Sequence, residues 1–86
     1  MDENTKRTPK DRKTPLQLKF GQLVREKRIP LSLSQLQLAG IANLHFTYIS
    51  SVERGERNIT LGNIAKIAFA LGCNLKDLMP DMPQRD

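Results

Sequence analysis

Apolar side chains recur at intervals of three and four residues near both ends of the chain, a spacing typical of one face of an α-helix. The N-terminal set predicts a helix that begins near Pro15 and ends at Ile29, because a residue before proline is pushed out of the helical conformation. Its apolar members are Leu16, Phe20, Leu23 and Val24. The C-terminal set predicts a helix opened by Thr60 and closed by Gly72. Its apolar members are Leu61, Ile64, Ile67, Ala68 and Leu71.

Between these helices, residues 33–55 read LSQLQLAGIANLHFTYISSVERG and contain two shorter periodic runs. Ser34 and Gln37 have the spacing of a capping box, which predicts the start of a helix. Asn43 tolerates the left-handed conformation that ends helices. A second run follows at once, with apolar positions at Leu44, Tyr48, Ile49 and Val52. Two short helices with a tight turn between them, and small Ala39 where they cross, form a helix-turn-helix.

The segments that flank this motif have simpler expectations. Leu31 and Leu33, in the link before the motif, are expected to be buried beneath it. Gly55 allows a left-handed end to the motif's second helix, which we place from about Phe46 to Arg54. Asn74 is expected to cap a short fifth helix, which runs from Leu75 to about Met79 and ends before Pro80.

The two ends of the chain differ in composition from its middle. Residues 1–15 contain no apolar residue after Met1, so we expect a disordered basic tail. It is either an arm that follows DNA or a solvated leader. The predicted domain spans residues 16–80, with a C-terminal tail at 81–86. No effector or catalytic domain is expected to follow, so regulation would depend on protein concentration through dimerisation.

Composition narrows the function classes. The 86 residues allow one domain, and the net charge of +5 suits a polyanionic partner. A single histidine, a single cysteine (Cys73, expected to be a small buried hydrophobe) and no glycine-rich phosphate loop leave no catalytic or metal constellation. We therefore expect no enzyme, cofactor or metal. The sequence shows neither a membrane span nor a signal peptide, which predicts a soluble, cytoplasmic protein.

The central stretch resembles the helix-turn-helix of the lambda-repressor-like class, the xenobiotic-response-element family of transcription factors. Its marks are Gln35 at the first helix, Ala39 at the crossing, Asn43 at the usual glycine position and the closing Glu53-Arg54-Gly55. The likeness covers roughly residues 20–79 and implies an all-α, five-helix DNA-binding domain. The segment ANLHFTYISSVERGERNIT is also similar to the controller proteins of restriction–modification systems, which implies a bacterial or phage origin.

The resemblance also implies a set of DNA-contacting residues on the motif and the loop that follows it. Specificity is expected from Phe46, Thr47 and Ser51. A Phe46 ring could touch a thymine methyl group but could not make the paired hydrogen bonds of an arginine to guanine. It could instead fold back onto Leu44, and Tyr48 could be a residue at the edge of the core. The candidate DNA contacts are Gln35, His45, Phe46, Thr47, Tyr48, Ser50, Ser51, Arg54, Arg57 and Asn58.

Two further expectations concern structure and assembly. The resemblance implies that Arg28 pairs with Glu53, although a surface arginine is the alternative. Phe69 falls outside the apolar face of its helix, which suggests either a homodimer interface or a plug under the C-terminal tail. The candidate interface residues are Phe69, Leu75, Leu78, Met79 and Met82.

These observations predict a sequence-specific DNA-binding regulator that acts as a homodimer on a short palindromic operator of double-stranded DNA. No small-molecule ligand is expected. One alternative is a phage-type repressor or antitoxin-type regulator that also binds a protein partner. Another is a protein-interaction module that no longer reads DNA.

Overall fold

The computed structural model describes residues 13–81, and local capping signals set where its helices begin. Helix α1 (Pro15–Arg28) begins after Thr14, and α2 (Gln35–Ala42) begins after Ser34. Both caps accept the backbone N–H of a glutamine three residues on, and that glutamine's side chain accepts the cap's own N–H. Exposed amides of the first turn are thereby satisfied within the chain.

The helices end where the backbone enters the left-handed region. Asn43 ends α2 at φ 58°, and Gly72 ends α4 (Leu61–Leu71) at φ 69°. Gly55, at φ 79°, follows α3 (Phe46–Glu53). A left-handed backbone suits glycine and asparagine, so all three predicted stops are confirmed.

The fold is all-helical and contains the predicted helix-turn-helix, but the fifth element is not an α-helix. Among the described residues there are four α-helices and two short 3₁₀ helices, η3 (Ile29–Leu31) and η4 (Leu75–Leu78). Element η4 stops because Met79 is extended, at φ −87° and ψ 119°, as expected for a residue before proline.

The reason given for the end of α1 was wrong. Ile29 keeps helical angles (φ −61°, ψ −45°) although Pro30 follows it. The chain tightens into η3 instead and then reverses at Ser32, which has φ 58°. No sequence signal of the usual kind marks Ser32, because left-handed serine is uncommon.

The four α-helices and η4 share one apolar core. Element η4 closes it from the C-terminal end, and Leu78 is wholly buried there. The two largest side chains that are fully buried in the helix-turn-helix are Leu38 and Ile49. The buried residues that pack together in this cluster are Phe20, Val24, Leu38, Ala39, Ile49, Val52, Ile64, Ile67, Ala68, Leu71 and Leu78.

Leu16 and Leu31, which were expected to be buried, are exposed, and so is Leu61 of the predicted α4 stripe. Leu16 and Leu61 lie in the first turns of their helices, where side chains point back beyond the helix N-terminus and past the packed surface. Leu31 lies in η3, just before the reversal at Ser32. The spacing of apolar residues shows which side of a helix faces the core, but not where along the helix the contact with the core ends. These positions were therefore assigned wrongly.

A close backbone approach joins α1 to the helix-turn-helix. A Cβ atom on Gly21 would collide with the carbonyl oxygen of Val52 and lie 2.8 Å from that of Glu53. Only glycine allows this contact, because its lack of a side chain lets two backbones meet. Gly21 therefore sets how closely α1 packs against the end of α3.

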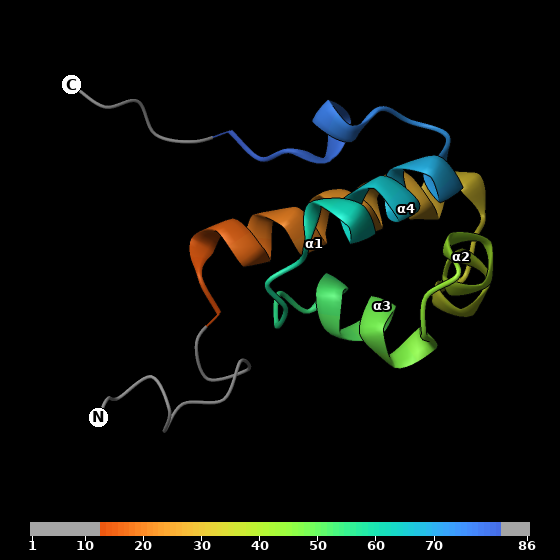
Figure 1. Cartoon of the computed structure of the whole chain (residues 1–86), viewed down its shortest axis with the longest axis horizontal. Coiled ribbons are helices and arrows are strands. Elements are labelled where there is room, and N and C mark those ends of the chain that lie inside the picture. The colour runs from red at the N-terminus through yellow and green to blue at the C-terminus, as the bar shows by residue number, and fades with distance from the viewer. Residues whose placement is uncertain (1–12, 82–86) are drawn as a thin grey trace.

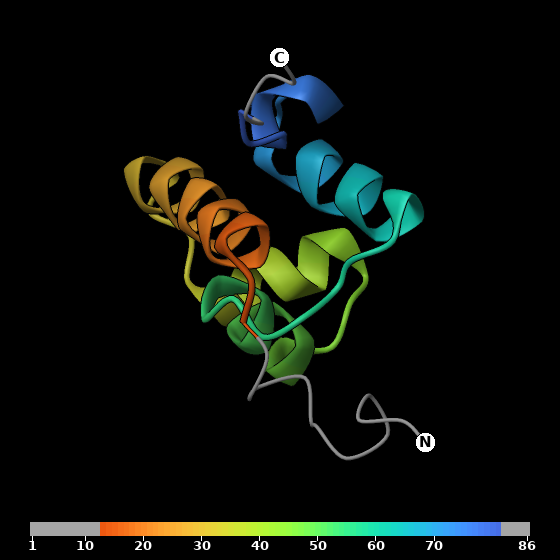
Figure 2. The ribbon, with the colours of Figure 1, turned by 90° about the vertical axis from the view of Figure 1, so that its left-hand side faces the viewer.

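The helices place α3 and the C-terminal segment on opposite sides of the molecule. Figures 1 and 2 show α1 and α4 between them, with α3 on one side and η4 on the other. The described chain begins on the α3 side, where Lys13 Nζ lies 3.7 Å from Glu56 Oε2. No helix among residues 13–81 is long and apolar enough to cross a membrane.

Candidate nucleic-acid interface

The N-terminus of α3 presents uncharged side chains to solvent. His45 caps the helix: its Nδ1 accepts the Thr47 N–H at 3.2 Å and lies 2.9 Å from Thr47 Oγ1. Phe46, the first helical residue, is 42% exposed, and Thr47 beside it is exposed. Phe46 has not folded back into the core, so its ring is available to a partner.

The next turn of α3 faces partly inward. Ser51 was expected to point away from the core, but it is only 6% exposed, and this expectation is wrong. Its hydroxyl donates to the Tyr48 carbonyl oxygen at 2.8 Å and accepts from Arg57 Nε at 2.9 Å. Tyr48 is half-buried against the core, and its hydroxyl accepts from Asn63 Nδ2 at 3.1 Å. The hydroxyl groups of both residues are therefore engaged within the protein.

A buried ion pair fastens α1 to the end of α3. Arg28 Nε lies 2.6 Å from Glu53 Oε2, and Arg28 Nη2 donates to Glu53 Oε1 at 2.9 Å. A third bond runs from Arg28 Nη1 to the Leu33 carbonyl oxygen at 2.7 Å. The hydrogen bond to Glu53 raises the pKa of Arg28 above its ordinary value, although burial opposes the rise. Gln35 joins this cluster, since its Nε2 donates to Glu53 Oε1 at 2.9 Å.

The far end of α3 and the following loop carry two exposed cations, Arg54 and Arg57. Arg54 is exposed and makes two bonds to Glu56, at 3.0 and 3.1 Å, which raise the pKa of Arg54. Its Nη1 also donates to Ser50 Oγ at 2.6 Å. Arg57 and Asn58 are both exposed, and Asn58 Oδ1 accepts from Gln17 Nε2 at 3.4 Å. The loop is therefore attached to α3 on one side and to α1 on the other.

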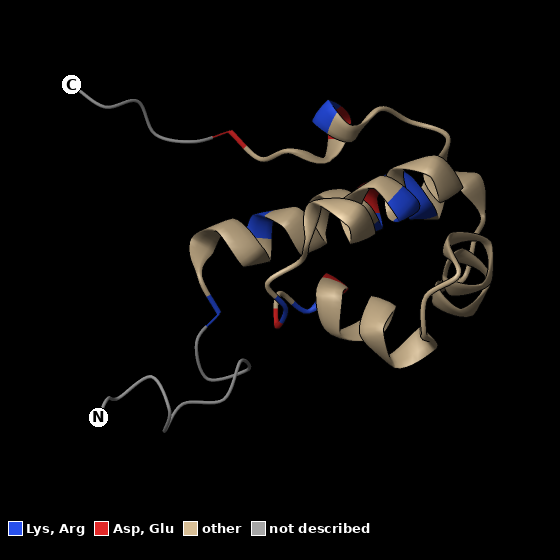
Figure 3. Cartoon of the chain, in the orientation of Figure 1, with Lys and Arg blue, Asp and Glu red and all other residues tan. Residues whose placement is uncertain are grey.

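Lysine, arginine, aspartate and glutamate occur in the motif only at its end, as Glu53 and Arg54. No Lys, Arg, Asp or Glu occurs between Arg28 and Glu53, so α2 and most of α3 are uncharged in Figure 3. Lys13, Arg54 and Arg57, which lie on this side of the molecule, fall outside that stretch. The surface therefore combines an uncharged helix end, suited to base edges, with basic residues beside it, suited to phosphates.

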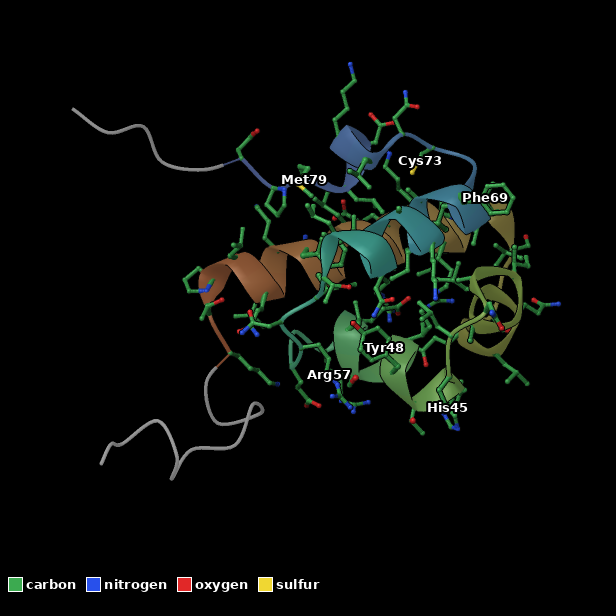
Figure 4. All side chains as sticks on the ribbon, viewed as in Figure 1. His45, Tyr48, Arg57, Phe69, Cys73 and Met79 are labelled. Atoms are coloured by element: carbon green, nitrogen blue, oxygen red, sulfur yellow. The ribbon has the colours of Figure 1, made fainter. Side chains whose placement is uncertain are left out.

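The opposite side carries exposed apolar residues on α4 and η4. Figure 4 shows Phe69 and Met79 there, away from His45, Tyr48 and Arg57. Phe69 is 79% exposed and Leu61, two helical turns before it, is 70% exposed. The exposed members of this α4–η4 surface are Leu61, Phe69, Leu75 and Met79. Leu78 belongs to the core and was wrongly assigned to an interface, whereas Met82 lies outside the described residues.

The described residues 13–81 contain one cysteine and no cluster of metal-ligating side chains. No group of three or more His, Cys, Asp or Glu side chains there could hold a metal ion. Cys73 is half-buried beside the core, and burial raises the pKa of its thiol. A raised pKa keeps the thiol protonated and unreactive at neutral pH.

With this geometry in hand, the comparisons identify the family. A family model described as helix-turn-helix matches residues 24–78, more than half of the chain. The chain belongs to the helix-turn-helix family. It is a DNA-binding transcription regulator, as the family match and the helix-turn-helix fold indicate.

Within this family, the chain is similar to several control proteins. The control protein C.BamHI of Bacillus amyloliquefaciens is 52% identical over 65 residues, which cover 74% of this chain and 80% of that protein. The control protein C.SmaI of Serratia marcescens is 50% identical over 56 residues, 65% of this chain and 67% of that protein. A crystal structure of the restriction–modification controller protein C.AhdI from Aeromonas hydrophila matches with a TM-score of 0.71 and 45% identity. It covers 72% of this chain and 94% of that one. The predicted resemblance to controller proteins is confirmed.

Sequence reasoning missed several residues that shape this surface. Gln17 was visible as the partner of Thr14 in a Thr-x-x-Gln capping pattern, although its contact with Asn58 was not. Asn63 and Gly21 act through contacts with residues far away in the chain, and no local pattern marks them.

Proposed function

We propose that this protein is the control protein of a restriction–modification system, and that it binds a short palindromic DNA operator as a homodimer. The observation that carries the proposal is the exposed, uncharged N-terminal end of α3 with Arg54 and Arg57 beside it. The likeness to named control proteins over most of their length supports the biological setting.

Base recognition is assigned to Phe46 and Thr47. Both are exposed on the first turn of α3, and neither side chain carries charge. A phenyl ring can contact the thymine methyl group in the major groove, and a threonine hydroxyl can bond to either kind of base edge. Ser51 is withdrawn from this role because it is buried.

Phosphate contacts are assigned to the residues around these readers. Arg54, Arg57 and Asn58 lie on the exposed loop, and His45 lies at the start of α3, where backbone amides also attract anions. Gln35 lies at the start of α2, although its amide nitrogen already bonds to Glu53. These contacts fix register and supply affinity that does not depend on sequence.

Dimerisation is assigned to the α4–η4 surface. Leu61 and Phe69 lie eight residues apart with Ala65 midway, so all three share one side of α4. Exposed leucine and phenylalanine at this spacing form a patch that one symmetric contact could bury for both subunits. One recognition helix reads too few base pairs to find a genomic site, and a dimer doubles the readout.

The two halves of the proposal are tested separately. Phe46→Ala should weaken binding to sites selected from a random duplex pool and leave random-duplex affinity nearly intact. Half-sites in the selected DNA should lie about 10–10.5 base pairs apart, or a multiple of that. Equal losses on both DNAs would show that Phe46 does not read bases.

For assembly, sedimentation at micromolar concentration should find the wild type dimeric and Phe69→Lys monomeric. Circular dichroism should show that Phe69→Lys keeps its full helical content. Leu36→Lys is the matched control, because Leu36 is a comparably exposed apolar residue on α2, outside the proposed interface. A monomeric wild type, or a Phe69→Lys protein that still dimerises, would refute the assigned interface.

A further inference from the structure

Arg57 is held in place by two residues of α3 rather than extending freely into solvent. Its Nε donates to Ser51 Oγ at 2.9 Å, and its guanidinium carbon lies 5.3 Å from the centre of the Tyr48 ring. The second contact has the distance of a cation–π interaction. Figure 4 shows Tyr48 and Arg57 on the same side of the molecule.

Tyr48 is itself fixed from α4. Its hydroxyl accepts a hydrogen bond from Asn63 Nδ2 at 3.1 Å, while the backbone N–H of Asn63 is held by Thr60 Oγ1, also at 3.1 Å. A chain of contacts therefore runs from the first turn of α4 through Asn63 and Tyr48 to the guanidinium of Arg57.

The Ser51 hydroxyl makes both of its hydrogen bonds within the protein. A buried hydroxyl is costly unless its hydrogen bonds are made. The Ser51 hydroxyl donates to the Tyr48 carbonyl oxygen and accepts from Arg57. The two bonds fix the direction of the serine oxygen, and this oxygen in turn fixes the direction of Arg57 Nε.

The outer edge of the guanidinium stays available. Within residues 13–81, no hydrogen bond or ion pair engages Nη1 or Nη2 of Arg57. Its Nε bonds to Ser51, and one face of its guanidinium group lies over the Tyr48 ring. The two Nη groups together suit the oxygens of a phosphate. The side chain is therefore held by its inner edge and presents its outer edge.

We propose that Ser51, Tyr48 and Asn63 are positioning residues that order Arg57 for contact with the DNA backbone before DNA binds. The inference rests on the proposed DNA-binding function and adds to it how one contact is prepared. Ordering a long side chain opposes binding, and a side chain that is already ordered avoids this loss. Ser51→Ala should therefore weaken DNA binding by about three- to tenfold.

Double-mutant cycles on random duplex test the proposal. In Ser51→Ala, Arg57 is no longer ordered before binding, so DNA affinity should fall. Arg57 keeps its charge and still reaches phosphate, so the salt dependence of binding should stay unchanged. Arg57→Ala should flatten the slope of log K against log salt by about one unit. Once Arg57 is removed, Ser51→Ala should cost nothing more, because the residue it positions is gone.

A second measurement uses the free protein. The Arg57 Nε–H should give a strong heteronuclear NOE in the wild type and a reduced one in Ser51→Ala. Tyr48→Phe and Asn63→Ala should each reduce the NOE by a smaller amount, because both remove the same Tyr48–Asn63 bond and leave the ring in place. Gln22→Ala is the control, since Gln22 lies on the exposed face of α1 and bonds to Glu26.

The outcomes separate the inference from the function on which it rests. No salt-dependent DNA binding by the wild type would overturn the proposed function itself. Normal binding with an Arg57 Nε–H as mobile in the wild type as in Ser51→Ala would overturn the positioning role alone. Losses from Ser51→Ala and Arg57→Ala that simply add would do the same, because they would show that the two residues act independently.

Discussion

Two arginine–glutamate pairs lie at the end of α3 and have opposite surroundings. Arg28 and Glu53 are almost wholly buried, with side-chain exposures of 10% and 3%, and join α1 to the helix-turn-helix. Arg54 and Glu56 follow Glu53 by one and three residues. The Arg54 side chain is 54% exposed and the Glu56 side chain is 15% exposed. Residue types and contact distances are similar, so the difference in burial decides what each pair does. The buried pair joins two parts of the fold, whereas the Arg54–Glu56 pair lies on the surface that we propose faces DNA.

The largest expected effect comes from breaking the buried pair. Arg28→Met should lower the free energy of unfolding by about 3 kcal/mol or more, because Glu53 would be left charged without its partner. Arg28→Met combined with Glu53→Leu should recover more than half of that loss. Recovery would be incomplete, since Gln35 and the Leu33 carbonyl also lose a partner. Chemical denaturation measures all three proteins, and an unchanged stability for Arg28→Met would show that the pair contributes nothing.

A second effect tests how tightly the same junction is packed. Gly21→Ala should destabilise the protein by about 1–3 kcal/mol or more, because the new Cβ would collide with the backbone of Val52 and Glu53. Gly40→Ala is the matched control on α2, where a Cβ would meet no atom within 4 Å. It should stabilise the protein by up to about 1 kcal/mol through helix propensity. Thermal melts that moved both variants in the same direction would contradict the packing described here.

The exposed arginine should show the reverse pattern. Arg54→Ala should leave the melting temperature unchanged, because an exposed ion pair contributes little to stability. It should weaken binding to random duplex and flatten the salt slope by about one unit. Titrations at several salt concentrations measure this. A lower melting temperature with unchanged DNA binding would place Arg54 with the buried pair.

The smallest effect is expected from the glutamate of the exposed pair. Glu56 accepts from Arg54 and lies 3.7 Å from Lys13 Nζ, so it offsets positive charge on the side that we propose faces DNA. Glu56→Gln should raise affinity for random duplex a few-fold and steepen the salt slope by at most about one unit. A weaker affinity would mean that Glu56 holds Arg54 in a binding orientation rather than competing with phosphate.

What the sequence predicted well is local. Ser34 with Gln37, Asn43, Gly55 and Gly72 mark helix ends through their own backbone preferences, and all of them fall where expected. The helix-turn-helix could therefore be placed almost to the residue.

What it could not predict depends on contacts between distant residues. Leu61 fits the stripe of α4 but extends past it, and Leu78 looks like a surface residue until η4 folds over the core. Ser51 is polar and was expected outside, yet Arg57 supplies the bond that allows its burial. An apolar surface was expected around Phe69. On α4 this surface also includes Leu61, which was not expected there.

The absence of charge between Arg28 and Glu53 has a consequence for how such a regulator can diverge. In the proposed function, non-specific attraction to DNA is assigned to cations outside this stretch, and the choice of bases is assigned to uncharged side chains within it. Substitutions at Phe46 or Thr47 can therefore retarget the protein without altering its general hold on DNA. Ancestral and descendant regulators could search a genome equally fast while obeying different operators. Because of this separation, residues on the first turn of α3 could be exchanged to engineer new specificities.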